Sequence, residues 1–210
     1  MQNFPGAKYD LTVSRETQER LENFAKLFLK WSKSINLIAP STIEQLWTRH
    51  ILDSLQLRNV IEISGRWIDL GSGGGFPGIV TAVLLAEEQK GWIDLVESNQ
   101  KKCSFLRMAL AETGGRGAAH PVRIENAAKT LAAPDFISAR ALAELDQLFE
   151  YVQPWTTSKP DLKLIFHKGR DYRSEVDKAR GRWEFDLVEH QSVVETDSVI
   201  LEIASLTRRV

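Results

Sequence analysis

DLGSGGGFPGI, residues 69–79, contains five glycines within eight residues. A short apolar run (67–70) precedes this stretch and a longer one (79–86) follows it, which predicts a strand, a bare loop and then a helix over 78–89. In open α/β folds, a loop that follows a strand in this way lies at the carboxyl ends of the strands, where ligands bind. The glycines therefore predict a backbone that approaches a ligand closely.

Short apolar runs alternate with helical stretches from Arg66 onward. Such alternation is typical of a mostly parallel sheet wrapped by helices. Two further runs, from Trp183 to the end, are close together and predict a terminal hairpin that adds one antiparallel strand. The first five predicted strands are 67–70, 92–97, 121–125, 135–140 and 162–168. We therefore predict a single α/β domain with its core in residues 64–210.

Residues 1–63 predict a helical extension packed on that core. An apolar stripe at three- and four-residue steps follows a predicted N-cap at Ser14. Ser41 and Glu44 have the spacing of a capping box and predict the start of a second helix over 46–55. The stripe consists of Leu21, Phe24, Phe28, Trp31 and Ile35.

The composition excludes several classes of protein. The chain has 210 residues, of which 43% are hydrophobic and 26% charged, as in a globular soluble protein, and its net charge of −1 limits any nucleic-acid contact to a local patch. One cysteine and four scattered histidines provide neither a disulfide nor a zinc-binding spacing, so we expect no metal. We find no signal peptide and no apolar run long enough to span a membrane, and we expect a cytoplasmic protein.

The glycine loop is compatible with a phosphate, a dinucleotide or a sulfonium nucleoside. A phosphate loop requires lysine where Ile79 stands. Residues 73–78 satisfy the GxGxxG pattern of dinucleotide sites, but Pro77 has no N–H to offer a pyrophosphate and the carboxylate of Asp69 would repel one. These residues disfavour a ligand whose phosphate contacts the loop.

Glu97 ends the second predicted strand. In nucleotide-binding α/β folds, an acid at this position accepts hydrogen bonds from both hydroxyls of the ribose. A strand, this loop, a helix, a second strand and an acid form the pattern of class I S-adenosylmethionine-dependent methyltransferases. Their cofactor carries ribose hydroxyls and a positive sulfur but no phosphate. The loop and Glu97 together therefore favour S-adenosylmethionine.

Most of the chain resembles the RsmG (GidB) family of bacterial methyltransferases. The resemblance rests on NLIAPSTIEQLWTRHILDSL (36–55), the glycine loop, VESNQKKCSFLR (96–107), RIE (123–125), SARALAEL (138–145) and HKG (167–169). It implies a class I, Rossmann-like fold with a seven-stranded sheet and a helical N-terminal extension. It also implies methylation of N7 of a single guanine of 16S ribosomal RNA, guanine 527 in the usual numbering, in the 530 loop. Because N7 carries a lone pair and no proton, in-line transfer to it needs no general base.

The loop pattern and the resemblance together give two sets of site residues. The expected cofactor contacts are Gly71, Gly73, Phe76, Glu97, Ile124, Glu125 and Arg140. The expected RNA contacts are Arg49, His50, Asp53, Lys101, Arg140, Lys168 and Arg170. For His50 and Asp53 a packing role is an open alternative, because both lie on an apolar helix face.

The expected partner is 16S ribosomal RNA, either in the small subunit or in an assembly intermediate, and we expect a monomer that does not contact membranes. A methyltransferase of small molecules would share the same cofactor loop. A nicotinamide-dependent oxidoreductase would retain the GxGxxG match but must accommodate Pro77 and Asp69. Both remain alternatives from the sequence.

Overall fold

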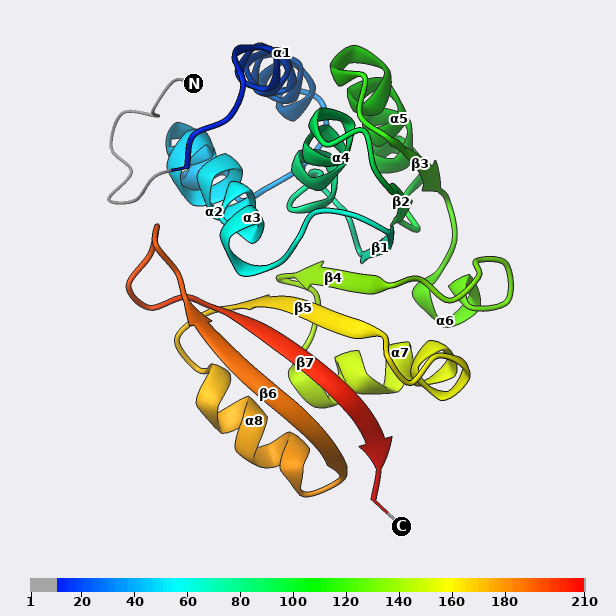
Figure 1. The fold of residues 1–210 in the computed structure, drawn as a ribbon. Helices are drawn as coiled ribbons and strands as arrows, with labels where there is room; N and C mark the ends of the chain where they lie inside the picture. Colours follow the sequence, from blue (N-terminus) through cyan, green and yellow to red (C-terminus); the bar gives the residue numbers. More distant parts are fainter. Residues whose placement is uncertain (1–10, 210) are drawn as a thin grey trace.

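The computed structural model of the chain describes residues 11–209. Its centre is one seven-stranded sheet in the order β3-β2-β1-β4-β5-β7-β6 (Figure 1). Strand β7 runs antiparallel to both of its neighbours, and the other strand pairs are parallel. The strands are β1 (Arg66–Leu70), β2 (Trp92–Val96), β3 (Gly117–His120), β4 (Phe136–Arg140), β5 (Lys163–Lys168), β6 (Trp183–Gln191) and β7 (Val199–Arg208). This arrangement confirms the predicted α/β sheet with one antiparallel strand.

Helices cover both faces of the sheet (Figure 1). One apolar cluster joins Phe24, Ile79 and Phe105, which belong to α1 (Arg15–Ser32), α4 (Gly78–Glu87) and α5 (Gln100–Thr113). A second cluster joins Phe149 of α7 (Leu145–Ser158) to Val176 of α8 (Tyr172–Arg180). The shorter helices are α2 (Asp53–Leu55), α3 (Leu57–Val60), α6 (Ile124–Ala127), the 3-10 helix η1 (Pro40–Gln45) and the π-helix η2 (Leu46–Leu52).

Helix α1 begins as predicted and packs its apolar stripe inward. The Ser14 Oγ accepts a hydrogen bond from the Thr17 N–H at 3.1 Å, which confirms the N-cap. Phe24 and Phe28 are fully buried, and their ring centroids lie 5.3 and 5.4 Å from that of Phe76 in the glycine loop. The N-terminal region is thus fastened to the loop by aromatic packing.

The capping box predicted for Ser41 and Glu44 is wrong. Helix η1 begins after Ala39 and has no side-chain hydrogen bond at its cap. Pro40, which lacks an N–H and has a fixed φ, occupies the first turn, so Ser41 lies inside the helix and not before it. The chain then continues as the π-helix η2 instead of a regular α-helix.

The third predicted strand, 121–125, is also wrong. Strand β3 ends at His120, and the following Pro121 has no N–H with which to continue the ladder. Ile124 instead opens helix α6. The real strand consists of Gly117, two alanines and His120, whose low strand propensity hides it from a pattern search.

Candidate active site

The glycine loop connects β1 to α4 at the carboxyl edge of the sheet, as predicted. Gly71 has φ +64°, and a Cβ placed there would lie 2.7 Å from a methyl group of Leu142. Backbone strain therefore disfavours a side chain at Gly71, and the methyl group of Leu142 would have to move to admit one. Gly73 also has a positive φ, +48°, but the nearest atom to its Cβ would be 3.5 Å away.

Asp69 supports the loop from beneath. Its side chain is buried, and its Oδ1 accepts a 2.7 Å hydrogen bond from the Ser138 hydroxyl. A Cβ at Gly78 would come within 2.6 Å of the other carboxylate oxygen, so glycine is required at the start of α4. Burial raises the pKa of Asp69 to about 6, which leaves it largely ionised at neutral pH.

Glu97 ties the loop to the end of β2. Its Oε2 accepts a 3.0 Å hydrogen bond from the Gly73 N–H, and its Oε1 accepts one of 2.7 Å from the Asn99 N–H. Because each carboxylate oxygen has two lone pairs, both oxygens can still accept a hydrogen bond from a ligand hydroxyl. Glu97 is buried, so such a bond would form in a partly desolvated setting.

A cavity of about 210 Å³, here named the loop cavity, lies against the glycine loop. It is lined by His50, Phe76, Lys102, Arg140 and Ala141, by Leu37 and Ile38, and by residues 71–74 of the glycine loop. The cavity thus combines bare loop backbone with apolar walls. Bare backbone and apolar walls suit a nucleoside. Glu97 does not line the cavity, but its carboxylate accepts from the N–H of Gly73, which does.

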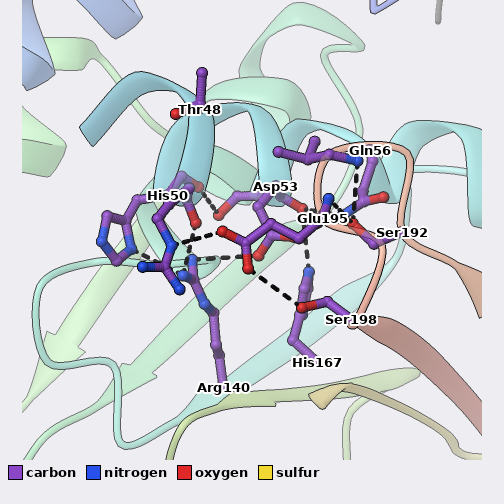
Figure 2. Close-up of polar contacts among 12 residues, drawn as sticks. Thr48, His50, Asp53, Gln56, Arg140, His167, Ser192, Glu195 and Ser198 are labelled. Atoms are coloured by element: carbon purple, nitrogen blue, oxygen red, sulfur yellow. Dashed lines mark hydrogen bonds and ion pairs between the residues drawn. The ribbon is translucent and has the colours of Figure 1, made fainter. Parts of the chain in front are cut away.

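Arg140, the last residue of β4, is held from three sides (Figure 2). Its Nη2 donates hydrogen bonds to the Arg49 carbonyl oxygen at 2.7 Å and to the His50 Nδ1 at 2.8 Å. Its Nη1 lies 3.4 Å from an Asp53 carboxylate oxygen. Burial lowers the pKa of Arg140, and the neighbouring Asp53 opposes that shift. We name Arg140 and these three partners the arginine cluster.

The π-helix η2 explains why three partners reach one guanidinium. Arg49 and His50 lie on η2, and Asp53 follows it directly as the first residue of α2. The wider turn of a π-helix redirects side chains relative to an α-helix, and such turns recur at functional sites. A backbone carbonyl, an imidazole and a carboxylate are thereby presented together to Arg140.

His50 is neutral and fully engaged. Burial, with the nearby charges of Arg140 and Arg49, lowers the pKa of His50 to about 3. Its Nδ1 accepts from Arg140, its Nε2 lies 3.2 Å from the Thr42 hydroxyl, and its ring packs 5.2 Å from that of Phe76. With both nitrogens occupied, His50 positions Arg140 and is unsuited to act as a general base.

A second cavity of about 530 Å³, the strand-end cavity, opens beside the first. It shares Arg140 and Ala141 with the loop cavity. Ala141 has φ +50°, an uncommon conformation for alanine that accompanies functional sites. Arg140 therefore stands in the common wall between two adjacent cavities. The remaining charged lining residues are Arg49, Asp53, Glu144, Lys168, Glu175 and Glu195.

Two of the predicted RNA contacts, Lys168 and Arg170, differ in burial and in pairing. Lys168 is nearly buried, and its ammonium donates to the Ala143 carbonyl oxygen at 2.7 Å and to Glu175 at 2.5 Å. Lys168, which the sequence placed among the RNA contacts, is thus paired within the protein at the wall of the strand-end cavity. Arg170, by contrast, is 79% exposed and forms an ion pair with Asp197 at the surface.

Several other predicted contacts lie apart from the cavities. Ile124 and Glu125 begin α6, where Ile124 is half-buried and Glu125 is exposed, and neither lines the loop cavity. Lys101 is exposed in the first turn of α5, whereas the next residue, Lys102, lines the loop cavity. Glu195 has no motif around it, so no signal in the sequence indicated its place beside Arg140.

The family model for GidB, described as rRNA small subunit methyltransferase G, matches residues 17–203. The chain belongs to the GidB family. Two relatives named "Ribosomal RNA small subunit methyltransferase G" agree with this assignment. The protein of Rhizobium rhizogenes is 63% identical over 198 residues, covering 94% of this chain and 97% of that protein. The protein of Rhizobium meliloti is 60% identical over 200 residues, covering 95% of this chain and 94% of that protein.

Solved structures with low sequence identity share the fold. A variant of MtNAS in complex with S-adenosylmethionine has a TM-score of 0.58 at 16% identity, over 90% of this chain and 76% of that one. The fibrillarin/Nop5p complex has a TM-score of 0.56 at 15% identity, over 75% of this chain and 81% of that one. GidB membership confirms the predicted family and agrees with the predicted cofactor.

Within residues 11–209, no group of three histidine, cysteine, aspartate or glutamate side chains is arranged to hold a metal ion. Over the same residues, every helix is too short or too polar to cross a membrane.

Proposed function

We propose that this GidB protein transfers a methyl group from S-adenosylmethionine to N7 of one guanine in 16S ribosomal RNA, guanine 527 in the usual numbering. The observation that carries the proposal is Arg140, fixed in the wall between the loop cavity and the strand-end cavity. A cofactor in the first cavity and a base in the second would meet at this residue.

The loop cavity supplies what the cofactor needs. Bound S-adenosylmethionine supplies an electrophilic methyl group on a positively charged sulfur. Glu97 would hold the ribose hydroxyls, and the backbone of Gly71 and Gly73 would lie along the nucleoside. The buried carboxylate of Asp69 adds negative charge beneath the loop, which favours a cation over a phosphate.

The chemistry of N7 suits the groups around Arg140. N7 presents a lone pair, so no proton must be removed before it attacks, and both nitrogens of His50 are already engaged. Methylation leaves the purine positively charged. Asp53 offsets the charge of Arg140, which would otherwise oppose this change. The cluster therefore acts by positioning and by its electrostatic field.

Contact with RNA requires cations near the cavity mouth. Arg49 is 42% exposed at the rim of the strand-end cavity, and Arg170 lies beyond the end of β5 with its guanidinium in solvent. Lys102 lines the loop cavity from α5. These few cations form a local patch on a chain whose net charge is −1. We expect modest affinity for free RNA and specificity from the assembled substrate.

The test is the methylation state of 16S RNA in cells. Small-subunit RNA from a strain lacking this gene is digested and compared by mass spectrometry with RNA from the same strain carrying the wild-type gene or Gly71→Val. We expect 7-methylguanosine in the target fragment only with the wild-type gene. An unmodified guanine in the complemented strain, or methylation at another atom, would refute the proposal.

A further inference from the structure

Glu195 is the acidic residue of the strand-end cavity that lies beside the arginine cluster (Figure 2). One residue, Arg49, connects the two: its carbonyl oxygen accepts from Arg140, and its Nε lies 2.5 Å from the Glu195 Oε1. The Glu195 side chain is 33% exposed, so it faces the cavity and is not sealed within the protein. A donor and an acceptor thus stand next to each other on one wall.

The segment that carries Glu195, residues 192–198 between β6 and β7, is held in place. The Ser192 Oγ accepts from the Glu195 N–H at 3.1 Å, and the Ser198 N–H donates to the Glu195 carbonyl oxygen at 3.1 Å. Gln56 binds the segment to the N-terminal region, donating to the Ser192 Oγ at 3.2 Å and accepting from the Val193 N–H at 3.0 Å. The carboxylate is therefore presented by a fixed backbone, as a recognition group should be.

Both groups retain hydrogen-bonding capacity. The Glu195 Oε2 accepts one long hydrogen bond, from the Ser198 hydroxyl at 3.5 Å. The Arg140 Nη1 is buried, lies 3.4 Å from the Asp53 carboxylate and makes no hydrogen bond within residues 11–209. A ligand that offers an acceptor and then a donor along one edge would satisfy both.

Guanine presents an acceptor and then a donor along one edge. Beginning at N7, it presents two acceptors, N7 and O6, and then the N1–H donor. Adenine presents N7, then an amino donor, then a bare N1 acceptor, so it would set donor against donor and acceptor against acceptor. With N7 directed at the shared wall of the two cavities, O6 would meet Arg140 and N1–H would meet Glu195.

We infer that Glu195 is a specificity-determining residue that accepts the N1–H of the target guanine while Arg140 donates to O6. The inference rests on the proposed function, because it assumes a guanine presented through N7. It assigns selectivity between purines to a residue outside the motifs of the chain. A mismatched base leaves buried polar groups unpaired, which is how such sites reject close analogues.

The test separates recognition of N1–H from a structural role. Small subunits are reconstituted with semisynthetic 16S RNA carrying guanine, inosine or 2-aminopurine at the target position, and single-turnover methyl transfer is measured. Guanine and inosine share O6 and N1–H, and 2-aminopurine lacks both. We expect Glu195→Ala to reduce transfer to guanine and to inosine roughly ten- to a hundredfold, with no loss on 2-aminopurine.

Two variants control the measurement. Arg49→Ala breaks the same ion pair but keeps the carboxylate, so it should reduce transfer to all three bases by the same factor. Thr196→Ala, at an exposed position of the same segment, should leave all three unchanged. Equal losses on the three bases with Glu195→Ala, or undiminished transfer to guanine, would overturn the inference alone. A wild-type protein inactive on guanine would overturn the proposed function and the inference with it.

Discussion

The loop cavity and the arginine cluster adjoin each other, yet they are constructed in different ways. The loop uses backbone groups and glycine conformations from ten consecutive positions, 69–78, supported by the carboxylate of Asp69 within that stretch. It also uses the side chain of Glu97, 24 residues from the amide it binds. The cluster uses the side chain of Arg140 and partners 90 and 91 residues away. One site depends on local chain geometry and the other on how the N-terminal region packs.

This difference predicts different responses to mutation. A substitution in the loop alters the backbone and should abolish binding of the cofactor. A substitution in the cluster alters the direction or charge of one group and should reduce methyl transfer while leaving the cofactor site intact. Five experiments separate the two regions, beginning with the largest effect.

Gly71→Val should abolish S-adenosylmethionine binding, raising Kd by more than a hundredfold. Valine disfavours φ +64°, so the loop backbone is strained, and the Leu142 methyl group 2.7 Å from the new Cβ must also move. Calorimetric titration gives Kd, and circular dichroism monitors folding. Gly169→Val is the control, because a Cβ there meets nothing within 4 Å. Normal cofactor binding by Gly71→Val would place the cofactor elsewhere.

Arg140→Lys should slow methyl transfer about a hundred- to a thousandfold while changing cofactor affinity little. A single ammonium cannot replace the planar fork that reaches Arg49, His50 and Asp53 together. Single-turnover rates on small subunits measure the effect. Arg107→Lys, the same change at an exposed arginine, should be neutral. If both variants retain full rates, the cluster does not position the base.

Glu97→Ala should weaken S-adenosylmethionine binding roughly ten- to a hundredfold, because a charge-assisted hydrogen bond contributes about 1.5–3 kcal/mol. The variant also loses two bonds that hold the loop, to the N–H groups of Gly73 and Asn99. Calorimetry at constant pH gives Kd, and Glu112→Ala, at an exposed position of α5, provides the reference. An unchanged Kd would remove Glu97 from the cofactor site.

Lowering the pH should destabilise the folded protein, because His50 of the arginine cluster is kept neutral there. The pKa of His50 is lowered to about 3 in the folded protein, so the unfolded chain binds more protons between about pH 6.5 and 3. Stability therefore falls as the pH drops through this window. Allowing for solvent screening, we expect a loss of about 1 kcal/mol at pH 5 relative to pH 7. Urea unfolding of wild type and His50→Asn at both pH values measures it; equal losses in the two proteins would exclude His50 as the cause.

The smallest effects concern the cations. Arg170→Ala should reduce the slope of log affinity against log salt by about one unit and weaken RNA binding a fewfold. Lys168→Ala should leave that slope unchanged and lower Tm, because its ammonium is paired with Glu175 inside the protein. Filter binding at two salt concentrations distinguishes them. A reduced slope for Lys168→Ala would show that the ion pair opens when RNA binds.

The sequence by itself determined the β1–loop–α4–β2 unit, the place of Glu97 and the cap of α1. Each of these is encoded by neighbouring residues: glycines where φ is positive, an acid at a strand end, and Ser14 three residues before Thr17, whose N–H donates to the Ser14 hydroxyl. The family resemblance indicated Arg140, His50 and Asp53 but not what they do to one another.

Only the tertiary structure decided the roles of these side chains. The π-helix η2 and the first residue of α2 together present three groups to Arg140. Lys168 turns inward to Glu175, and Glu195 reaches the cluster from the β6–β7 connection. Strand β3 was likewise hidden, because its alanines gain strand structure from pairing with β2 and not from their own propensity. Contacts between residues about 90 positions apart depend on how elements pack, and no local pattern along the chain records that packing.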